Sequence, residues 1–130
     1  DLPRNILVEK IHSQQKIIIA SNHHFHDTPS VFDMEVLLDT MEATGADIRK
    51  LAVMPVEAED VLKLLTATLH ANQKGAAPVI TMSMSGLGAL SLVCGQVFGS
   101  VVTFGTVGAA SAPGQLEIGK LRQMLENLQI

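Results

Sequence analysis

Residues 16–47 read KIIIASNHHFHDTPSVFDMEVLLDTMEATGAD and hold one predicted strand followed by one predicted helix. The strand is predicted over residues 16–21, because a short unbroken apolar run is typical of a parallel strand covered on both faces. Asp27 or Thr28 can cap the helix, Pro29 suits its first turn, and Gly45 marks its end. Apolar residues recur between those points at helical spacing and form one face: Val31, Met34, Leu37, Leu38 and Met41. The stretch is therefore one β/α unit.

The same unit recurs along the rest of the chain. Further apolar runs predict strands at residues 51–55, 79–84 and 101–105. Helices are predicted before, between and after the strands, within residues 4–15, 57–75, 87–98 and 114–129. Strict alternation in the order α-β-α-β-α-β-α-β-α implies an α/β fold with a parallel sheet and right-handed crossovers. Ligands of such folds bind at the carboxyl ends of the strands, so we expect a site in the loops that follow them.

The composition indicates a single globular domain, residues 1–130, since 47% of the residues are hydrophobic and 17% are charged. A formal net charge of −4 with scattered Lys and Arg argues against a nucleic-acid partner, which requires a clustered basic face. No apolar run reaches the roughly 18 residues of a membrane span, so no membrane partner is expected. The single cysteine, Cys94, excludes an internal disulfide and fits a reducing compartment, and we expect a cytoplasmic protein.

Three histidines crowd the loop SNHHFHD, residues 21–27. Side chains alternate along a strand, so His23 and His24 should point to opposite faces and cannot easily bind one metal ion. His23 and His26 could approach each other with a turn at Phe25, but no acidic or thiol ligand follows at a familiar spacing. A zinc site is therefore disfavoured, and each histidine taken alone is better explained as a polar loop residue.

Lys50 stands at the start of the otherwise apolar strand predicted at residues 51–55. Taken alone, it is better explained as a side chain that reaches solvent from the strand edge. The alternative is chemical: an apolar barrel interior disfavours the charged amine and lowers its pKa, so the neutral amine can attack a carbonyl group. A histidine at the end of the neighbouring strand, such as His23, can then move protons.

Apolar and polar residues near the other strand ends could line a ligand site. Met82 and Met84 share one face of their strand, and Phe104 ends the strand predicted at 101–105; these residues suit either the core or an apolar wall. Ser111 and Gln115 lie at a predicted helix start, where free N–H groups and side-chain donors suit hydroxyls or an anion. Capping and turn roles explain the same two residues without a ligand.

Taken together, the segments resemble the C-terminal half of type I 3-dehydroquinate dehydratase, a (β/α)8-barrel family of the shikimate pathway. The matching words run in family order from about residue 16 to residue 125: SNHHFHDTP, ADIRKLAVMP, DVLKLLTAT, ITMSM, QVFGSVVTFG and SAPGQ. Several long matching segments in the same order are far more specific to a family than one short motif. The resemblance implies a lyase that binds a small molecule, 3-dehydroquinate, and needs no metal and no organic cofactor.

The resemblance also implies a role for each candidate residue. Lys50 matches the lysine that forms an imine with the substrate ketone, and His23 matches the general acid/base that assists imine formation and loss of water. The other candidates match residues that pack on the substrate ring or contact the substrate from a closing loop: Met82, Met84 and Phe104 for the ring, and Ser111 and Gln115 for the loop.

This chain departs from the family pattern in its site residues. A catalytic glutamate that assists the histidine has no counterpart here, and His24 replaces an acidic or amide residue. Leu92 follows Ser91 where family members carry an arginine that grips the substrate carboxylate. Loss of that contact should weaken binding by about 2–5 kcal/mol.

The family barrel has eight strands, and the resemblance accounts for only the last four, strands 5–8 of a TIM-type barrel. We therefore expect a parallel (β/α) half-barrel with two bare edges and one apolar face, which needs a partner. The chain opens with Asp1 rather than Met, and we expect it to have been cut from a longer polypeptide. The expected partner is a complementary half-barrel or a second copy in a homo-oligomer. The alternative to an enzyme is a catalytically degenerate half-barrel that serves as a binding or assembly module.

Overall fold

A computed structural model describes residues 4–75, 77–110 and 114–128 of the chain. Three parallel strands form a sheet in the order β1-β2-β3: β1 (Ile19–His23), β2 (Ile48–Val53) and β3 (Val79–Ser83). Five α-helices and one 3-10 helix are described: α1 (Arg4–Ser13), α2 (Val31–Ala43), α3 (Ala58–Lys74), α4 (Ser85–Cys94), η1 (Gly95–Phe98) and α5 (Ile118–Asn127). Two short parallel strands, β4 (Gly105–Thr106) and β5 (Leu116–Glu117), form a separate pair. The chain therefore has an α/β fold with parallel strands.

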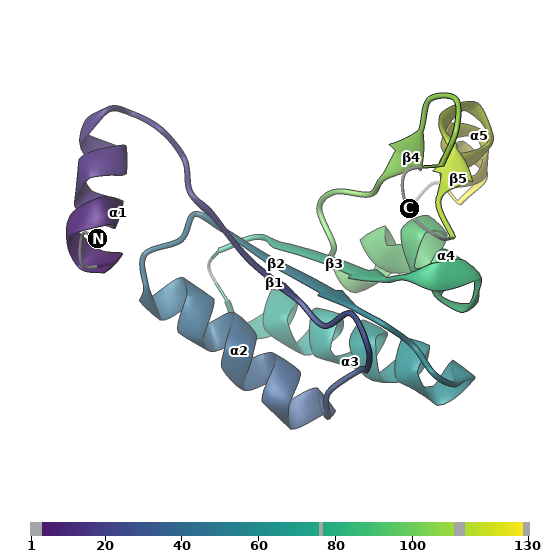
Figure 1. Cartoon of the computed structure of the whole chain (residues 1–130), viewed down its shortest axis with the longest axis horizontal. Helices are drawn as coiled ribbons and strands as arrows, with labels where there is room; N and C mark the ends of the chain where they lie inside the picture. The colour runs from purple at the N-terminus through teal and green to yellow at the C-terminus, as the bar shows by residue number, and fades with distance from the viewer. Residues whose placement is uncertain (1–3, 76, 111–113, 129–130) are drawn as a thin grey trace.

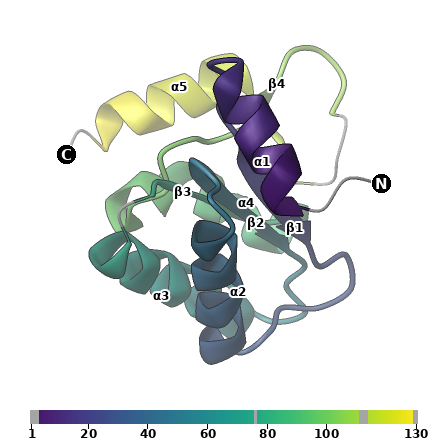
Figure 2. The ribbon, with the colours of Figure 1, turned by 90° about the vertical axis from the view of Figure 1, so that its left-hand side faces the viewer.

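The helices α2 and α3 lie side by side on one face of the three-stranded sheet (Figures 1 and 2). The core forms between this face and the two helices, and its fully buried members include Met34, Leu38, Leu51, Val53 and Leu64. Among the described elements, none covers the middle of the opposite face, while α1 and α5 stand at opposite ends of the molecule in Figure 1. The helices α2 and α3 thus cover one side of the sheet. On the other side, here called the open face, Ile19 of β1 is exposed, whereas Ala52 and Ile80 are buried.

Strand register fixes which side chains share the open face. Lys50 on β2 pairs with Ser21 on β1 and with Ile80 on β3, and His23 pairs with Ala52. Paired residues of adjacent strands point to the same face of a sheet. His23 and Lys50 therefore lie on the open face, away from α2 and α3.

The strand predictions for residues 16–21, 51–55 and 79–84 are confirmed in place, with ends that shift by up to three residues. The prediction for residues 101–105 is wrong, because only Gly105 of that stretch belongs to a strand. Ser100 makes one bridge to Val79, and its Oγ accepts a hydrogen bond from the N–H of Thr81 at 3.1 Å. A side chain thus takes the place of the backbone in the ladder, and the pairing stops there.

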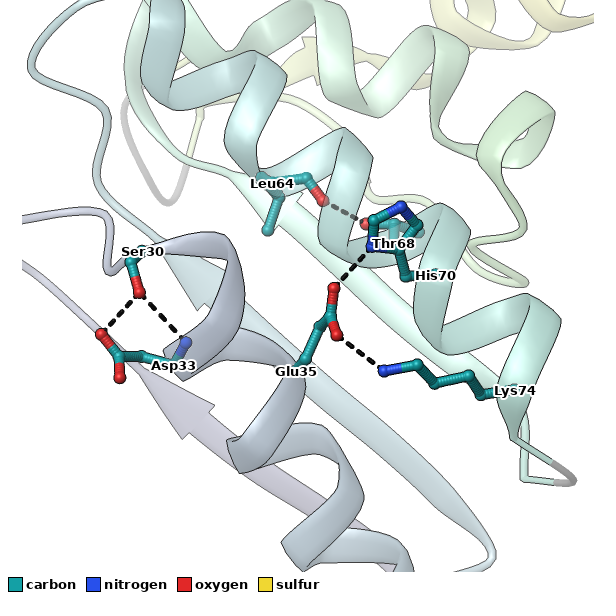
Figure 3. Close-up of polar contacts among 7 residues, drawn as sticks. All are labelled: Ser30, Asp33, Glu35, Leu64, Thr68, His70 and Lys74. Atoms are coloured by element: carbon teal, nitrogen blue, oxygen red, sulfur yellow. Dashed lines mark hydrogen bonds and ion pairs between the residues drawn. The ribbon is translucent and has the colours of Figure 1, made fainter.

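The helix α2 is capped by Ser30, not by Asp27 or Thr28 as the sequence suggested. The N–H of Asp33 donates to Ser30 Oγ at 3.1 Å, and Ser30 Oγ donates to the Asp33 carboxylate at 2.7 Å (Figure 3). Thr28 instead donates its hydroxyl to the carbonyl of Met54 at 2.9 Å. This bond ties the loop after β1 to the loop after β2, so both loops are held at the same end of the sheet.

Glu35 on α2 joins the two covering helices through two side chains of α3. Its carboxylate oxygens lie 2.5 Å from His70 Nδ1 and 2.6 Å from Lys74 Nζ (Figure 3). Hydrogen bonds from Lys74 and then from His70 hold the pKa of the Glu35 carboxyl below its ordinary value. The three side chains fix the outer edges of α2 and α3 to each other.

Arg49 lies at the opposite end of the sheet from these loops and is fully buried, with an exposed fraction of 0%. Its Nη2 donates to the carbonyl of Ala77 at 2.5 Å and to that of Ala71 at 3.2 Å. Its Nη1 lies 2.9 Å from Glu42 Oε2 as an ion pair, without the alignment of a hydrogen bond. The guanidinium thereby joins β2 to the carboxyl ends of both covering helices.

Candidate functional site

A cavity of about 190 Å³ lies at the carboxyl ends of the strands. Its wall is made by β1, β2 and β3, by the start of α4, and by two later segments of the chain. The described residues that line it are His23, Lys50, Ala52, Met82, Ser83, Met84, Ser85, Leu92, Phe104, Gly114 and Gln115. The cavity therefore gathers every candidate site residue from the sequence except Ser111, which lies outside the described residues.

Lys50 lies in the middle of β2, not at the start of a strand as the sequence suggested. The sequence pattern missed residues 48–50 because the charged Arg49 interrupts the apolar run. Lys50 Nζ stands 5.0 Å from the centroid of the Phe104 ring, close enough for a cation–π contact. The amine is thus held against an aromatic ring within the cavity.

His23 is the last residue of β1, and its ring stacks on that of Phe25 with centroids 5.7 Å apart. His24 lies in a different hollow, beside α2, and its Nδ1 is 3.4 Å from the carboxylate of Asp27. The prediction that His23 and His24 point to opposite faces is confirmed. Within the described residues, no three His, Cys, Asp or Glu side chains come together in a group that could hold a metal ion.

The apolar part of the wall comes from Met82 near the end of β3, from Met84 directly after this strand, and from Phe104. Gln115 reaches the cavity from the segment before β5, beside Gly114. A cavity with one amine, one imidazole, an aromatic ring and two thioethers can hold a small carbonyl compound with its carbonyl carbon near the amine. This chemistry is that of imine formation, with the imidazole as proton carrier.

The sequence profile of the Type I 3-dehydroquinase family matches residues 2–130. The chain belongs to the type I 3-dehydroquinase family. It is 51% identical over 124 residues to a 3-dehydroquinate dehydratase of Lactiplantibacillus plantarum, an alignment that covers 95% of this chain and 49% of the relative. The chain spans about half the length of the curated relatives it matches.

Solved structures of type I 3-dehydroquinase relatives share the fold. The 3-dehydroquinate dehydratase from Geobacillus kaustophilus HTA426 superposes with a TM-score of 0.94 at 40% identity, covering 97% of this chain and 49% of that one. The type I enzyme from Clostridium difficile, described with covalent modified comenic acid, gives a TM-score of 0.91 at 41% identity, covering 96% and 50%. No helix among the described residues is long and apolar enough to cross a membrane.

Sequence reasoning missed two serines that line this cavity. Ser83 ends β3, and Ser85 opens α4 with a backbone φ of +62°, a left-handed conformation that non-glycine residues rarely adopt. The adjacent Ser85-Gly86 pair is a turn signal that could have indicated a sharp change of direction after β3. Leu92, noted in the sequence for its departure from the family pattern, also lines the cavity and is 7% exposed.

Proposed function

We propose that this chain carries the imine-forming part of a 3-dehydroquinate dehydratase, a lyase that converts 3-dehydroquinate into 3-dehydroshikimate. That reaction belongs to the shikimate pathway of aromatic amino acid biosynthesis. The observation that carries the proposal is the meeting of His23, Lys50 and Phe104 in one cavity at the strand ends. The relatives from Lactiplantibacillus plantarum and Geobacillus kaustophilus are 3-dehydroquinate dehydratases, which supports the same reaction.

In the proposed reaction Lys50 Nζ adds to the ketone carbon, and the ketone oxygen leaves as water, which gives an imine. The protonated imine withdraws electrons from the neighbouring carbon, so a base can remove a proton there. His23 takes that proton and returns it to the hydroxyl on the next carbon, which leaves as a second water molecule. One water molecule then hydrolyses the imine and frees Lys50, so the net change is loss of one water from the substrate.

The remaining cavity residues have binding roles in this proposal. Met82, Met84 and Phe104 pack on the carbocyclic ring, and Ser111 and Gln115 contact its polar groups. The chain's own residues supply the nucleophile and the proton carrier, so the proposal uses no metal and no organic cofactor. Covalent modification in the Clostridium difficile relative supports a nucleophile in the site of this one.

Reductive trapping tests the proposed nucleophile. We expect that incubation with 3-dehydroquinate and borohydride adds one substrate-derived mass to the protein, and that peptide mapping places it on Lys50. The adduct should disappear in Lys50→Met and persist in Lys16→Met, a matched change at an exposed lysine outside the cavity. Equal labelling of Lys50→Met and wild type would refute the assignment of Lys50.

We also propose that the chain forms strands 5–8 of a TIM-type barrel and completes it with a complementary half-barrel or a second copy. The open face of the sheet and the edge strand β1 support a partner, because an unpaired edge is a template for further strand pairing. Light scattering after size-exclusion chromatography tests this. A monodisperse monomer with a cooperative melt would contradict the proposal.

The second candidate is a non-catalytic half-barrel that serves as a binding or assembly module. Leu92 favours it, since a leucine in the cavity wall cannot grip a carboxylate as an arginine does. Turnover of 3-dehydroquinate by the chain with its complementary half would exclude this candidate. Adduct formation on Lys50 without turnover would favour it.

A further inference from the structure

We propose that Phe25 is a positioning residue, which holds the imidazole ring of His23 in the orientation that proton transfer requires. The two rings stack nearly parallel, with 11° between their planes and 5.7 Å between their centroids. His23 lines the cavity, whereas Phe25 is not among the described lining residues, so Phe25 acts on a ligand there only through His23. The inference rests on the proposed function, because it concerns the proton carrier of that reaction.

Polar contacts within the described residues do not fix the ring plane of His23. The side chain is exposed, and its ring makes no hydrogen bond or ion pair in the described part of the chain, where its one aromatic contact is with Phe25. The last side-chain torsion of a histidine is broad, so the side chain alone does not select one ring orientation. A proton carrier must bring a ring nitrogen within about 2.6–3.2 Å of the group that it serves. A contact that fixes the ring plane therefore favours proton transfer.

Strand geometry places Phe25 beside His23. Side chains two residues apart along an extended chain point to the same side. The pairing with β2 continues past His23, because the N–H of His24 donates to the carbonyl of Ala52 at 2.8 Å. Phe25 thus follows His23 on the same side of the chain, while His24 lines the separate hollow beside α2.

The loop that carries Phe25 is held by the loop after β2. The N–H of Met54 donates to the carbonyl of Asp27 at 3.0 Å, and the hydroxyl of Thr28 donates to the carbonyl of Met54 at 2.9 Å. Together with the bond from His24, these contacts fix the backbone on both sides of Phe25. The Phe25 side chain is 60% exposed, so packing in the core does not account for its position. The anchored backbone therefore holds the phenyl ring in place.

Proton NMR tests the stack without any substrate, because an aromatic ring shifts the signals of protons that lie over its face. We expect Phe25→Leu to move the ring-proton signals of His23 downfield, and Phe25→Tyr to leave them close to those of wild type. Phe32→Leu is the matched control, since Phe32 is 72% exposed on α2 and is not among the described lining residues. Unchanged His23 signals in Phe25→Leu, or an equal shift in Phe32→Leu, would overturn the proposal.

A double-mutant cycle tests whether the stack serves proton transfer. The assay is the rate at which 3-dehydroquinate and borohydride label Lys50. Phe25→Leu should lower this rate about 2- to 10-fold, the effect expected from the loss of one aromatic pair, and Phe25→Tyr should retain it. In a His23→Ala background the same change should have no further effect, because the ring that Phe25 orients is gone. An equal loss in both backgrounds would indicate a purely structural role and would overturn the proposal.

The two measurements separate failure of this inference from failure of the proposed reaction. If 3-dehydroquinate labels Lys50 in none of the proteins, the proposed function fails, and the NMR signals of His23 alone decide whether Phe25 orients the ring. If Lys50 is labelled at the same rate in wild type and in Phe25→Leu, the proposed function stands, and the positioning role of Phe25 is refuted.

Discussion

Gly88→Ala should push α4 away from β3 and displace the wall of the cavity. A Cβ at residue 88 would lie closer than 3.0 Å to the carbonyl oxygen and carbon of Ser83, which are backbone atoms with no freedom to turn aside. Carbon and oxygen atoms make ordinary contact at about 3.3 Å, so α4 must retreat by on the order of 1 Å. Overpacking of this kind destabilises a protein by about 1–3 kcal/mol, against a gain of up to about 1 kcal/mol in helix propensity.

The same displacement should reach the chemistry. Met84 and Ser85 line the cavity and lie within four residues of Gly88 in the chain, so a retreat of α4 moves the wall of the cavity. Misplacement of a binding group by 1 Å can lower a rate about 100-fold. We therefore expect a lower urea midpoint and much slower trapping of 3-dehydroquinate on Lys50.

Gly86→Ala is the control on the same helix. Its Cβ meets no atom within 4 Å, so it should keep the trapping rate and raise the unfolding free energy by up to about 1 kcal/mol. Urea denaturation followed by circular dichroism measures both variants under one condition. Equal urea midpoints for Gly88→Ala and wild type, with unchanged trapping, would refute the close packing of α4 on β3.

Two further predictions concern ion pairs outside the cavity. The pKa of Glu35 is lowered in the folded chain, so the stability that Glu35 contributes is present above its ordinary pKa of 4.5 and is lost as the pH falls below that value. Urea midpoints at each pH should therefore show that Glu35→Gln loses less stability than wild type between about pH 6 and pH 3, and that its unfolding free energy at neutral pH is lower by no more than about 1 kcal/mol. Glu42→Gln leaves the buried Arg49 without its acid and should reduce the unfolding free energy by about 2–3 kcal/mol, less than the roughly 3–5 kcal/mol of a fully buried pair because Glu42 is partly exposed. A loss below about 0.5 kcal/mol in urea denaturation would contradict a stabilising role for the pair.

The positions of three strands could be predicted from the sequence because their apolar runs are bounded by polar residues. The start of β2 could not, because Arg49 is charged yet fully buried, and only tertiary partners such as Glu42 make that burial tolerable. The strand expected at residues 101–105 has the right composition but lacks its ladder, since Ser100 Oγ replaces a backbone group beside β3. Composition predicts burial, whereas strand pairing depends on neighbours that the local sequence does not specify.

The candidate site was predictable to a similar degree. Strand alternation alone separated His23 from His24. The pattern placed Lys50 at the start of a strand, and only the family resemblance indicated that it would meet His23, Met82 and Phe104. The burial of Ser83 had no sequence signal, because a serine at a strand end is common in turns. It depends on the close approach of Gly88 in α4, which only the packed structure reveals.

The adjacent basic residues Arg49 and Lys50 favour one register of β2 within the sheet. Arg49 faces the helices, where Glu42 and two carbonyl oxygens receive it, and Lys50 faces the cavity, where no acid lies among the described lining residues. A slip of β2 by one residue would exchange these faces, leaving Lys50 under the helices and Arg49 beside Phe104. A register shifted by one residue would therefore leave both charges without their present surroundings, which disfavours that register. Replacement of Arg49 should consequently weaken the preference of β2 for this register, although Arg49 itself does not line the cavity that holds Lys50.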